Sequence, residues 1–183
     1  MNLAMRLALP LIACGLWAQP VALHLDTAHS TVEYTLGAIL HSVHGTFQLK
    51  RGALTFDPAT GKASGELVAD AASGSSGNSG RDRKMHESVL ESDRYPEIVF
   101  RPDRVEGKVN PAGHSQVQVH GVFVLHGSEH ELMVPVSVDA ANGGYTAAAT
   151  FTIPYIQWGM KNPSTLFLRV SDKVEVTVHA VAR

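Results

Sequence analysis

Most of this chain alternates apolar and polar residues with a period of two, and no other feature constrains its fold as strongly. In the stretch TVEYTL at 31–36 every second residue is apolar, and the same alternation recurs at 46–50 and 53–56. Because successive side chains of a strand point to opposite faces, this pattern predicts β-strands with one buried face. Further strands are expected at about 64–72, 97–106, 115–126, 131–140, 144–153 and 173–181. The pattern therefore favours an all-β domain.

Turn sequences separate these strands: DPATG at 57–61, NPAG at 110–113, GSE at 127–129 and NGG at 142–144. Strands divided in this way by Gly, Pro and Asn are typical of antiparallel sandwiches and barrels. The strand expected at 115–126 favours an elongated barrel, because a strand of that length at about 3.3 Å per residue reaches roughly 40 Å. A closed barrel also leaves no strand edge exposed.

One segment breaks the alternation and predicts a short amphipathic helix over 81–92. A Ser- and Gly-rich loop precedes it, and Ser79 with Asp82 has the S-x-x-D form of a capping box. Apolar residues then recur at helical spacing: Met85, Val89 and Leu90. The helix is expected to end before Pro96 and, being too short to be stable alone, to pack on the barrel.

The first 18 residues form a segment of their own. Arg6 precedes an apolar run over 7–18, which is the order of a secretory signal. The run is shorter than the roughly 20 residues that span a bilayer. We therefore expect 1–18 to be an export signal, 22–182 to be a single β-barrel domain, and the protein to be periplasmic or secreted.

Two ways of processing this segment are open. Ala18 is a small residue suited to ordinary cleavage before Gln19. The sequence LIAC at 11–14 resembles a bacterial lipobox, in which a lipidated Cys14 would anchor the protein to a membrane. Cys14 is the only cysteine, so a disulfide framework and a thiolate zinc site are both excluded.

The composition and the motifs of the chain argue against several classes of function. The 15 Lys and Arg against 17 Asp and Glu give a net charge of −2, which argues against a nucleic-acid partner. Asp26, His29 and Ser30 invite a hydrolase interpretation, but a triad needs its histidine held between nucleophile and acid in space. Neighbours in one turn rarely achieve that arrangement, so a hydrogen-bonded turn is favoured. No catalytic residue and no cofactor are predicted.

Histidine pairs are the remaining candidates for metal chemistry. They are His41 with His44, and His126 with His130. On a helix such spacings bring ligands together, but these pairs fall at strand ends and turns, where surface or hydrogen-bonded histidines are favoured. No metal site is predicted. Arg81 and Asp82 are open to two interpretations, of which a helix cap with a local ion pair is favoured over a charged group at a pocket mouth.

Five motifs follow one another along residues 22–181. They are DTAHSTVEYTL, HGTFQLKRGALTFDPATG, RDRKMHESVLESDRYPEIVF, VHGVFVLHGSEHELMVPV and VSDKVEVTV. In this order they resemble the YceI-like polyisoprenoid-binding family. Two departures are visible. Glu129, His130 and Glu131 stand where the family usually has T-K-P, and WGMKNPSTLFLRV at 158–170 is an extra stretch.

The resemblance implies a lipocalin-like, eight-stranded antiparallel β-barrel with one short helix behind an export signal. It implies a binding or carrier protein rather than an enzyme, whose partner is an apolar small molecule, in known members an isoprenoid. An apolar tunnel holds such a chain by burial, at about 0.8 kcal/mol per CH2, and needs few polar contacts.

Six residues on alternating faces match apolar positions of the family and are predicted to contact the ligand: Phe47, Phe56, Ile98, Phe100, Phe123 and Leu125. The alternation leaves open which face points inward, above all for Phe123 and Leu125, since Val122 and Val124 are apolar too. Two other functions stay open: a hydrolase or metal-dependent enzyme using a His-rich rim, and a structural barrel without a fixed ligand.

Overall fold

The computed structural model describes residues 19–38, 41–164 and 169–183. The expected export signal and Cys14 lie outside the described residues. The strands are β1 (Val21–His24), β2 (Thr31–Ala38), β3 (Ser42–Phe47), β4 (Leu49–Phe56), β5 (Ala63–Asp70), β6 (Glu97–Glu106), β7 (Gly113–Leu125), β8 (Ser128–Ala141), β9 (Gly144–Ile153) and β10 (Val170–Ala182). No helix in the described part of the chain is long and apolar enough to span a membrane.

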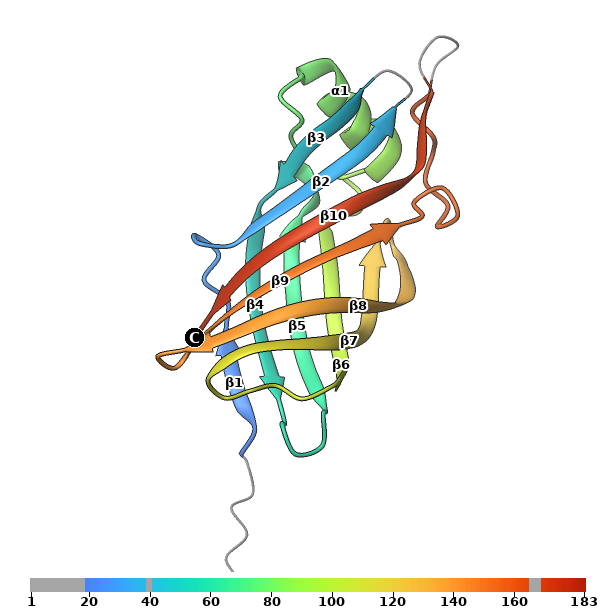
Figure 1. Cartoon of the computed structure of the whole chain (residues 1–183). Helices are drawn as coiled ribbons and strands as arrows, with labels where there is room; N and C mark the ends of the chain where they lie inside the picture. Colours follow the sequence, from blue (N-terminus) through green and yellow to red (C-terminus); the bar gives the residue numbers. More distant parts are fainter. Residues whose placement is uncertain (1–18, 39–40, 165–168) are drawn as a thin grey trace, which may run out of the picture.

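These strands form one curled antiparallel sheet in the order β1-β4-β5-β6-β7-β8-β9-β10-β2-β3 (Figure 1). β1 and β2 follow each other along one bent segment of the chain, and β3 and β4 are separated only by Gln48. The two ends of the sheet are thus halves of the same long hairpin, in which β1 pairs with β4 and β2 with β3. The ten strands therefore fill eight positions around a barrel, and the predicted eight-stranded antiparallel barrel is confirmed.

The join between β1 and β2 is secured by the last residues of the chain. Leu25 forms an isolated bridge with Ala182, and His24 and Arg183 exchange backbone hydrogen bonds of 2.7 and 3.0 Å. Asp26 N–H also donates to the carbonyl of Val181 at 2.8 Å. Sequence analysis did not predict β1, because Val21–His24 is too short to show an alternation of its own.

Two hairpin turns confirm the turn chemistry seen in the sequence. His126 and Gly127 join β7 to β8 with φ of 52° and 74°, and Asn142 and Gly143 join β8 to β9 with φ of 53° and 75°. Two successive residues with positive φ make turns whose twist matches that of the flanking strands. These turns set the register of β7 with β8 and of β8 with β9.

The predicted helix lies at one end of the barrel but differs in its bounds (Figure 1). It begins as α1 (Ser79–Lys84) and continues as a π-helix, η2 (Met85–Leu90), ending where Glu91 adopts a left-handed φ of 48°. The capping box is wrong: Asn78 is the N-cap, and its Oδ1 accepts the N–H of Arg81 at 3.0 Å. Asn caps a helix as well as Ser does. A short 3-10 turn, η1 (Ala71–Ser73), precedes this region.

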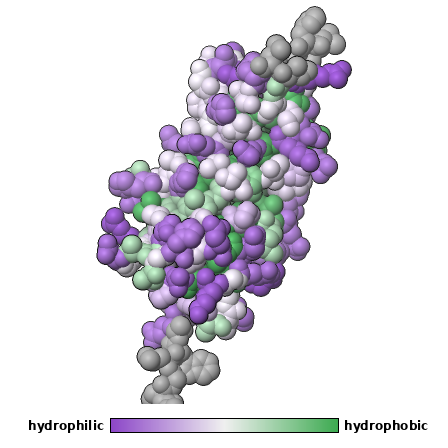
Figure 2. All heavy atoms as spheres, viewed as in Figure 1, coloured by the Kyte–Doolittle hydropathy of each residue, from purple (hydrophilic) through white to green (hydrophobic). Residues whose placement is uncertain are grey.

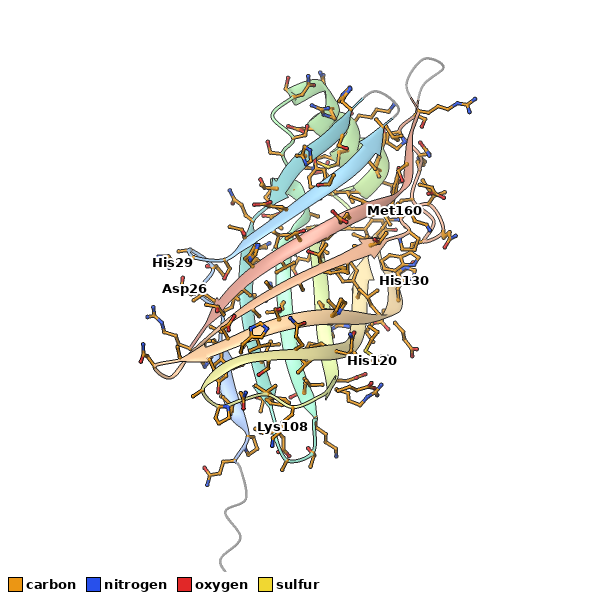
Figure 3. The ribbon with its side chains drawn as sticks, viewed as in Figure 1. Asp26, His29, Lys108, His120, His130 and Met160 are labelled. Atoms are coloured by element: carbon orange, nitrogen blue, oxygen red, sulfur yellow. The ribbon has the colours of Figure 1, made fainter. Side chains whose placement is uncertain are left out.

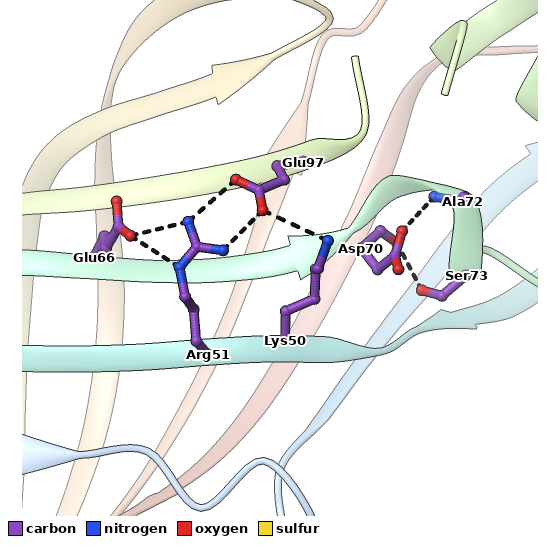
Figure 4. A network of polar contacts seen from close by, with 7 residues as sticks. All are labelled: Lys50, Arg51, Glu66, Asp70, Ala72, Ser73 and Glu97. Atoms are coloured by element: carbon purple, nitrogen blue, oxygen red, sulfur yellow. Dashed lines mark hydrogen bonds and ion pairs between the residues drawn. The ribbon is translucent and has the colours of Figure 1, made fainter. Parts of the chain in front are cut away.

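On the face shown in Figure 2, hydrophilic side chains are spread over the surface with apolar ones visible between them. On β4 to β6, the guanidinium of Arg51 donates to both carboxylate oxygens of Glu97, at 2.7 and 3.1 Å, and to Glu66 at 3.1 Å (Figure 4). Lys50 approaches Glu97 at 3.5 Å. The hydrogen bonds from Arg51 lower the pKa of Glu97. The network links β4, β5 and β6. Because it is exposed to solvent, it adds little to the free energy of unfolding.

Candidate ligand-binding cavity

The barrel encloses a cavity of about 710 Å³ along its interior. Every strand contributes side chains to its wall, and nearly all of them are apolar. The inward faces of the alternating strands therefore surround open space rather than a solid core. The volume lies within the roughly 300–1,000 Å³ typical of small-molecule sites.

All six residues predicted from the sequence lie on the cavity wall: Phe47, Phe56, Ile98, Phe100, Phe123 and Leu125. The inward face of β7 is the one that carries Phe123 and Leu125, because Val122 and Val124 do not line the cavity. The six differ in packing. Phe123 and Leu125 are only 7% and 6% exposed, whereas the other four keep surface open to the cavity. That these residues contact a ligand stays a prediction.

Small residues that sequence analysis missed leave the middle of the barrel hollow. The inward positions of β8, β9 and β10 there are valines and alanines: Val136, Val138, Ala147, Ala149 and Val178. The register places Val136, Ala149 and Val178 side by side across the three strands. Their short side chains do not reach the opposite wall. The alternation predicts that these positions lie on one face of their strands. The small size of their side chains was the signal that could have indicated a hollow interior.

One end of the cavity is filled by a cluster of large side chains. Its buried members are Val89, Leu90, Phe123, Leu125, Ile153, Tyr155 and Met160. Phe123 has three aromatic neighbours, with ring centroids 6.1 Å from Phe151, 5.9 Å from Trp158 and 6.4 Å from Phe100. η2 and the segment 154–164 both contribute to the cluster, so two segments outside the sheet close this end.

Tyr155 fixes the segment 154–164 to the barrel. Its hydroxyl donates to the carbonyl of Ser171 at 2.7 Å, and burial raises the pKa of Tyr155 to about 12. The segment folds back on itself, since Met160 N–H donates to the carbonyl of Tyr155 at 3.1 Å. Tyr155 and Met160 are 5% and 4% exposed, which makes this short segment part of the core.

The α1 region supplies the charged part of the wall. Its lining residues are Asn78, Gly80, Arg81 and Lys84. Arg81 Nε donates to the hydroxyl of Ser76 at 2.8 Å, and Lys84 Nζ donates to the carbonyl of Pro163 at 2.7 Å. Asp82 is not on the wall, because its carboxylate accepts the N–H of Ser76 at 2.8 Å. Arg81 is thus at the pocket, while Asp82 holds the preceding loop.

The residues behind the hydrolase interpretation form a turn on the outside of the barrel (Figure 3). Asp26 Oδ2 lies 2.9 Å from Nδ1 of His29. The hydroxyl of Ser30 instead donates to the backbone carbonyl of Asp26 at 2.6 Å and accepts the N–H of Val181 at 3.0 Å. Ser30 therefore serves the backbone and is not directed at His29.

The histidine pairs do not converge on a common point. His41 lines the cavity, whereas Nδ1 of His44 lies 3.0 Å from the hydroxyl of Thr35 on an exposed face. Nε2 of His126 lies 3.7 Å from Oε1 of Glu91. Over residues 19–38, 41–164 and 169–183, no three His, Cys, Asp or Glu side chains are grouped so that they could hold a metal ion.

The sequence of the barrel matches a known protein family. The profile of the YceI-like domain matches residues 23–182, nearly the whole of the described barrel. The chain belongs to the YceI-like domain family. No curated protein sequence is similar enough to count as a match.

Solved structures share the fold of this YceI-like domain at low sequence identity. BcnA of Burkholderia cenocepacia has a TM-score of 0.72 and 20% identity, covering 87% of this chain and 99% of its own. A polyisoprenoid-binding domain of Saccharophagus degradans has a TM-score of 0.68 and 16% identity, covering 88% and 97%. A YceI protein of Campylobacter jejuni gives 0.62 and 17%, covering 78% and 85%.

Both departures from the family pattern meet in this YceI-like domain. The ring of His130 stacks on that of Trp158, the first residue of the extra stretch, with centroids 3.9 Å apart and an interplanar angle of 3°. Nε2 of His130 is buried without a hydrogen-bond partner, and burial lowers the pKa of His130. The ring of His130 therefore serves here as a packing surface for the segment 154–164.

Proposed function

We propose that this chain is an exported binding or carrier protein that holds a long apolar molecule, a polyisoprenoid or a similar lipid, inside its barrel. The observation that carries the proposal is the cavity, about 710 Å³ enclosed by apolar side chains from every strand. A binding role rather than catalysis agrees with the arrangement of Asp26, His29 and Ser30, whose hydroxyl is engaged by backbone groups.

The size of the cavity suits a chain of moderate length. At about 30 Å³ for a group as large as a water molecule, roughly two dozen such groups fit into it. A chain of about 20 carbons would gain about 0.8 kcal/mol for each CH2 buried. Part of this gain is offset by the conformational and translational entropy that the ligand and the protein lose on binding. Burial alone therefore supplies enough free energy for binding.

Two further observations support the proposal. A structural neighbour with a TM-score of 0.68 is described as a polyisoprenoid-binding domain, and the family profile covers residues 23–182. Export is supported by Arg6 and the apolar run that follows it.

Native mass spectrometry of protein purified without detergent tests the binding role. We expect a co-purified apolar molecule, and we expect Ala149→Trp to lose it, because the new ring would occupy the hollow middle. Met133→Trp is the matched control, since Met133 is 41% exposed on the outer face of β8. An empty protein that also takes up no added polyprenol or long-chain lipid would contradict the proposal.

Sequencing of the mature N-terminus tests export. Ordinary cleavage should give a chain that starts at or near Gln19, whereas lipidation should give a blocked chain that starts at Cys14. Recovery of the intact chain with Met1 from the cytoplasm of its native host would disprove export.

A further inference from the structure

The cavity wall is charged at only one end. Among its described lining residues there is no Asp or Glu, and the charged ones are Arg81 and Lys84, both on α1. His41 and Asn78 line the same cavity. Apart from one threonine and three tyrosines, the rest of the wall is made of Gly, Pro and apolar residues. The charge on the cavity wall is therefore positive and confined to α1.

The two ends of the barrel differ in this respect. α1 lies beside the ends of β2 and β3 at one end of the barrel (Figure 1). Val105, Val109 and Tyr145 line the cavity toward the other end. Lys108 stands near that far end (Figure 3), but it is exposed and does not line the cavity. An amphiphilic molecule would therefore meet positive charge only next to α1.

Both cations have donors to spare. Arg81 uses Nε on Ser76, and an arginine carries four further N–H donors on its guanidinium nitrogens. Lys84 uses one of its three N–H donors on the carbonyl of Pro163. Within the described chain, no carboxylate forms an ion pair with either residue; the neighbouring Asp82 bonds to Ser75 and Ser76 instead.

We propose that Arg81 and Lys84 bind the anionic head group of the ligand, a phosphate or a carboxylate, while its apolar chain extends toward Val105 and Val109. The inference rests on the proposed lipid-binding function and deepens it. Charged hydrogen bonds from Arg and Lys to such groups are roughly twice as strong as neutral ones. Arg81 and Lys84 are exposed, so the head group would bind at the mouth of the cavity. The ligand thereby acquires one orientation in the barrel.

Two pairs of probes test the head-group site: geranylgeranyl phosphate with geranylgeraniol, and hexadecanoate with hexadecanol. Within each pair the apolar chain is the same and only the charge of the head differs. We expect the unmodified protein to bind at least one anion ten or more times as tightly as its alcohol. The pair that shows the larger ratio identifies the head as phosphate or carboxylate.

Variants then assign the preference to the two cations. R81Q/K84Q should reduce the ratio to near one while leaving the affinity for the alcohol within about twofold. R83Q/K108Q is the matched control, because it removes the same net charge from two exposed residues that do not line the cavity. It should keep the ratio. R81K/K84R, which retains both charges, should keep most of it and show that the effect is not one of folding.

The outcomes separate this inference from the proposed function. If alcohols bind but the anions bind no tighter, or if R81Q/K84Q keeps the preference, the head-group site is overturned and lipid binding stands. If no probe binds to the unmodified protein, lipid binding itself fails and the head-group site fails with it.

Discussion

The packed end of the barrel and its hollow middle are built from the same strands with the same alternation, yet large side chains close the one and small side chains leave the other open. At the packed end, Phe123 and Leu125 of β7 are buried against η2 and the segment 154–164. In the middle, Val136 and Ala149 face open space. The period-two pattern gives each strand an apolar face, and in the fold that face points inward. Side-chain size and the presence of a covering segment decide whether that face is filled.

The difference shows where stability and binding reside in this molecule. Large side chains at the covered end reach one another across the barrel, so a loss there removes contacts on several sides. Small side chains in the middle have no partner opposite them, so a change there alters the space available to a ligand. The two regions should therefore respond to substitution in opposite ways.

The largest effect is expected for Leu90→Asp at the packed end. Leu90 is 8% exposed within the core cluster, and a carboxylate at this position would be buried without a partner. The free energy of unfolding should fall by about 3 kcal/mol or more, as measured by denaturant titration. Glu87→Ala on the exposed face of η2 is the control and should change it by less than about 0.5 kcal/mol. An unchanged midpoint for Leu90→Asp would show that η2 does not pack on the barrel.

The same added ring should have different effects in the two regions. Leu125→Trp overpacks the covered end and should cost about 1–3 kcal/mol. Ala149→Trp places the ring in open space, so its unfolding midpoint should stay near that of the unmodified protein while bound lipid is lost. Denaturant unfolding and native mass spectrometry of both variants provide the measurement. Equal loss of stability in both variants would mean that the middle is also a packed core.

An effect of similar size should follow removal of the stacked ring by Trp158→Ala. The ring contacts His130 and Phe123, and truncation of a partly buried aromatic side chain should cost about 2–3 kcal/mol. Trp158→Phe, which keeps a ring, should recover most of this. Proteolysis is the second readout, since a loosened segment 154–164 should be cut faster. Unchanged stability and cleavage would mean that the stack does not secure the segment.

The smallest expected effect is a pH dependence from His130. Because burial lowers the pKa of this imidazole, the unfolded chain binds a proton more readily than the folded one. Stability should therefore decline as the pH falls below the usual histidine value of about 6.5 and level off below the lowered pKa. In His130→Phe this part of the decline should be absent, as seen by comparing unfolding midpoints between pH 7.5 and 5. Identical profiles of the two proteins would contradict the assignment.

Much of the barrel could be predicted from the sequence, because the alternation of apolar and polar residues follows directly from the extended backbone of a strand. The bounds of β6 (97–106) and β9 (144–153) agree with the expectation, and all six predicted lining residues face the cavity. Their contact with a ligand stays a prediction. The helix bounds and its π-helical second half depend on local hydrogen bonds, such as the cap by Asn78, that residue spacing does not specify.

The charged end of the cavity could not be settled from the sequence for a different reason. Arg81 and Asp82 are adjacent and of opposite charge, so the sequence favours a helix cap with a local ion pair over a pocket mouth. Only the fold directs Asp82 to Ser76 and leaves Arg81 on the wall. The hollow middle could not be settled from the sequence either. Whether the side chains of Ala147 and Ala149 contact an opposite wall depends on strands far away in the sequence.

The pairing of β10 with both β9 and β2 has a consequence for how the barrel is made. Until β10 has joined, the chain up to β9 is an open sheet whose two free edges and apolar inner face are exposed. Such edges invite pairing with other chains. The inner face that later surrounds a ligand is then the surface most at risk of aggregation. Speed of closure by the final strand, more than the strength of any single contact, should decide how much newly made protein reaches the folded state.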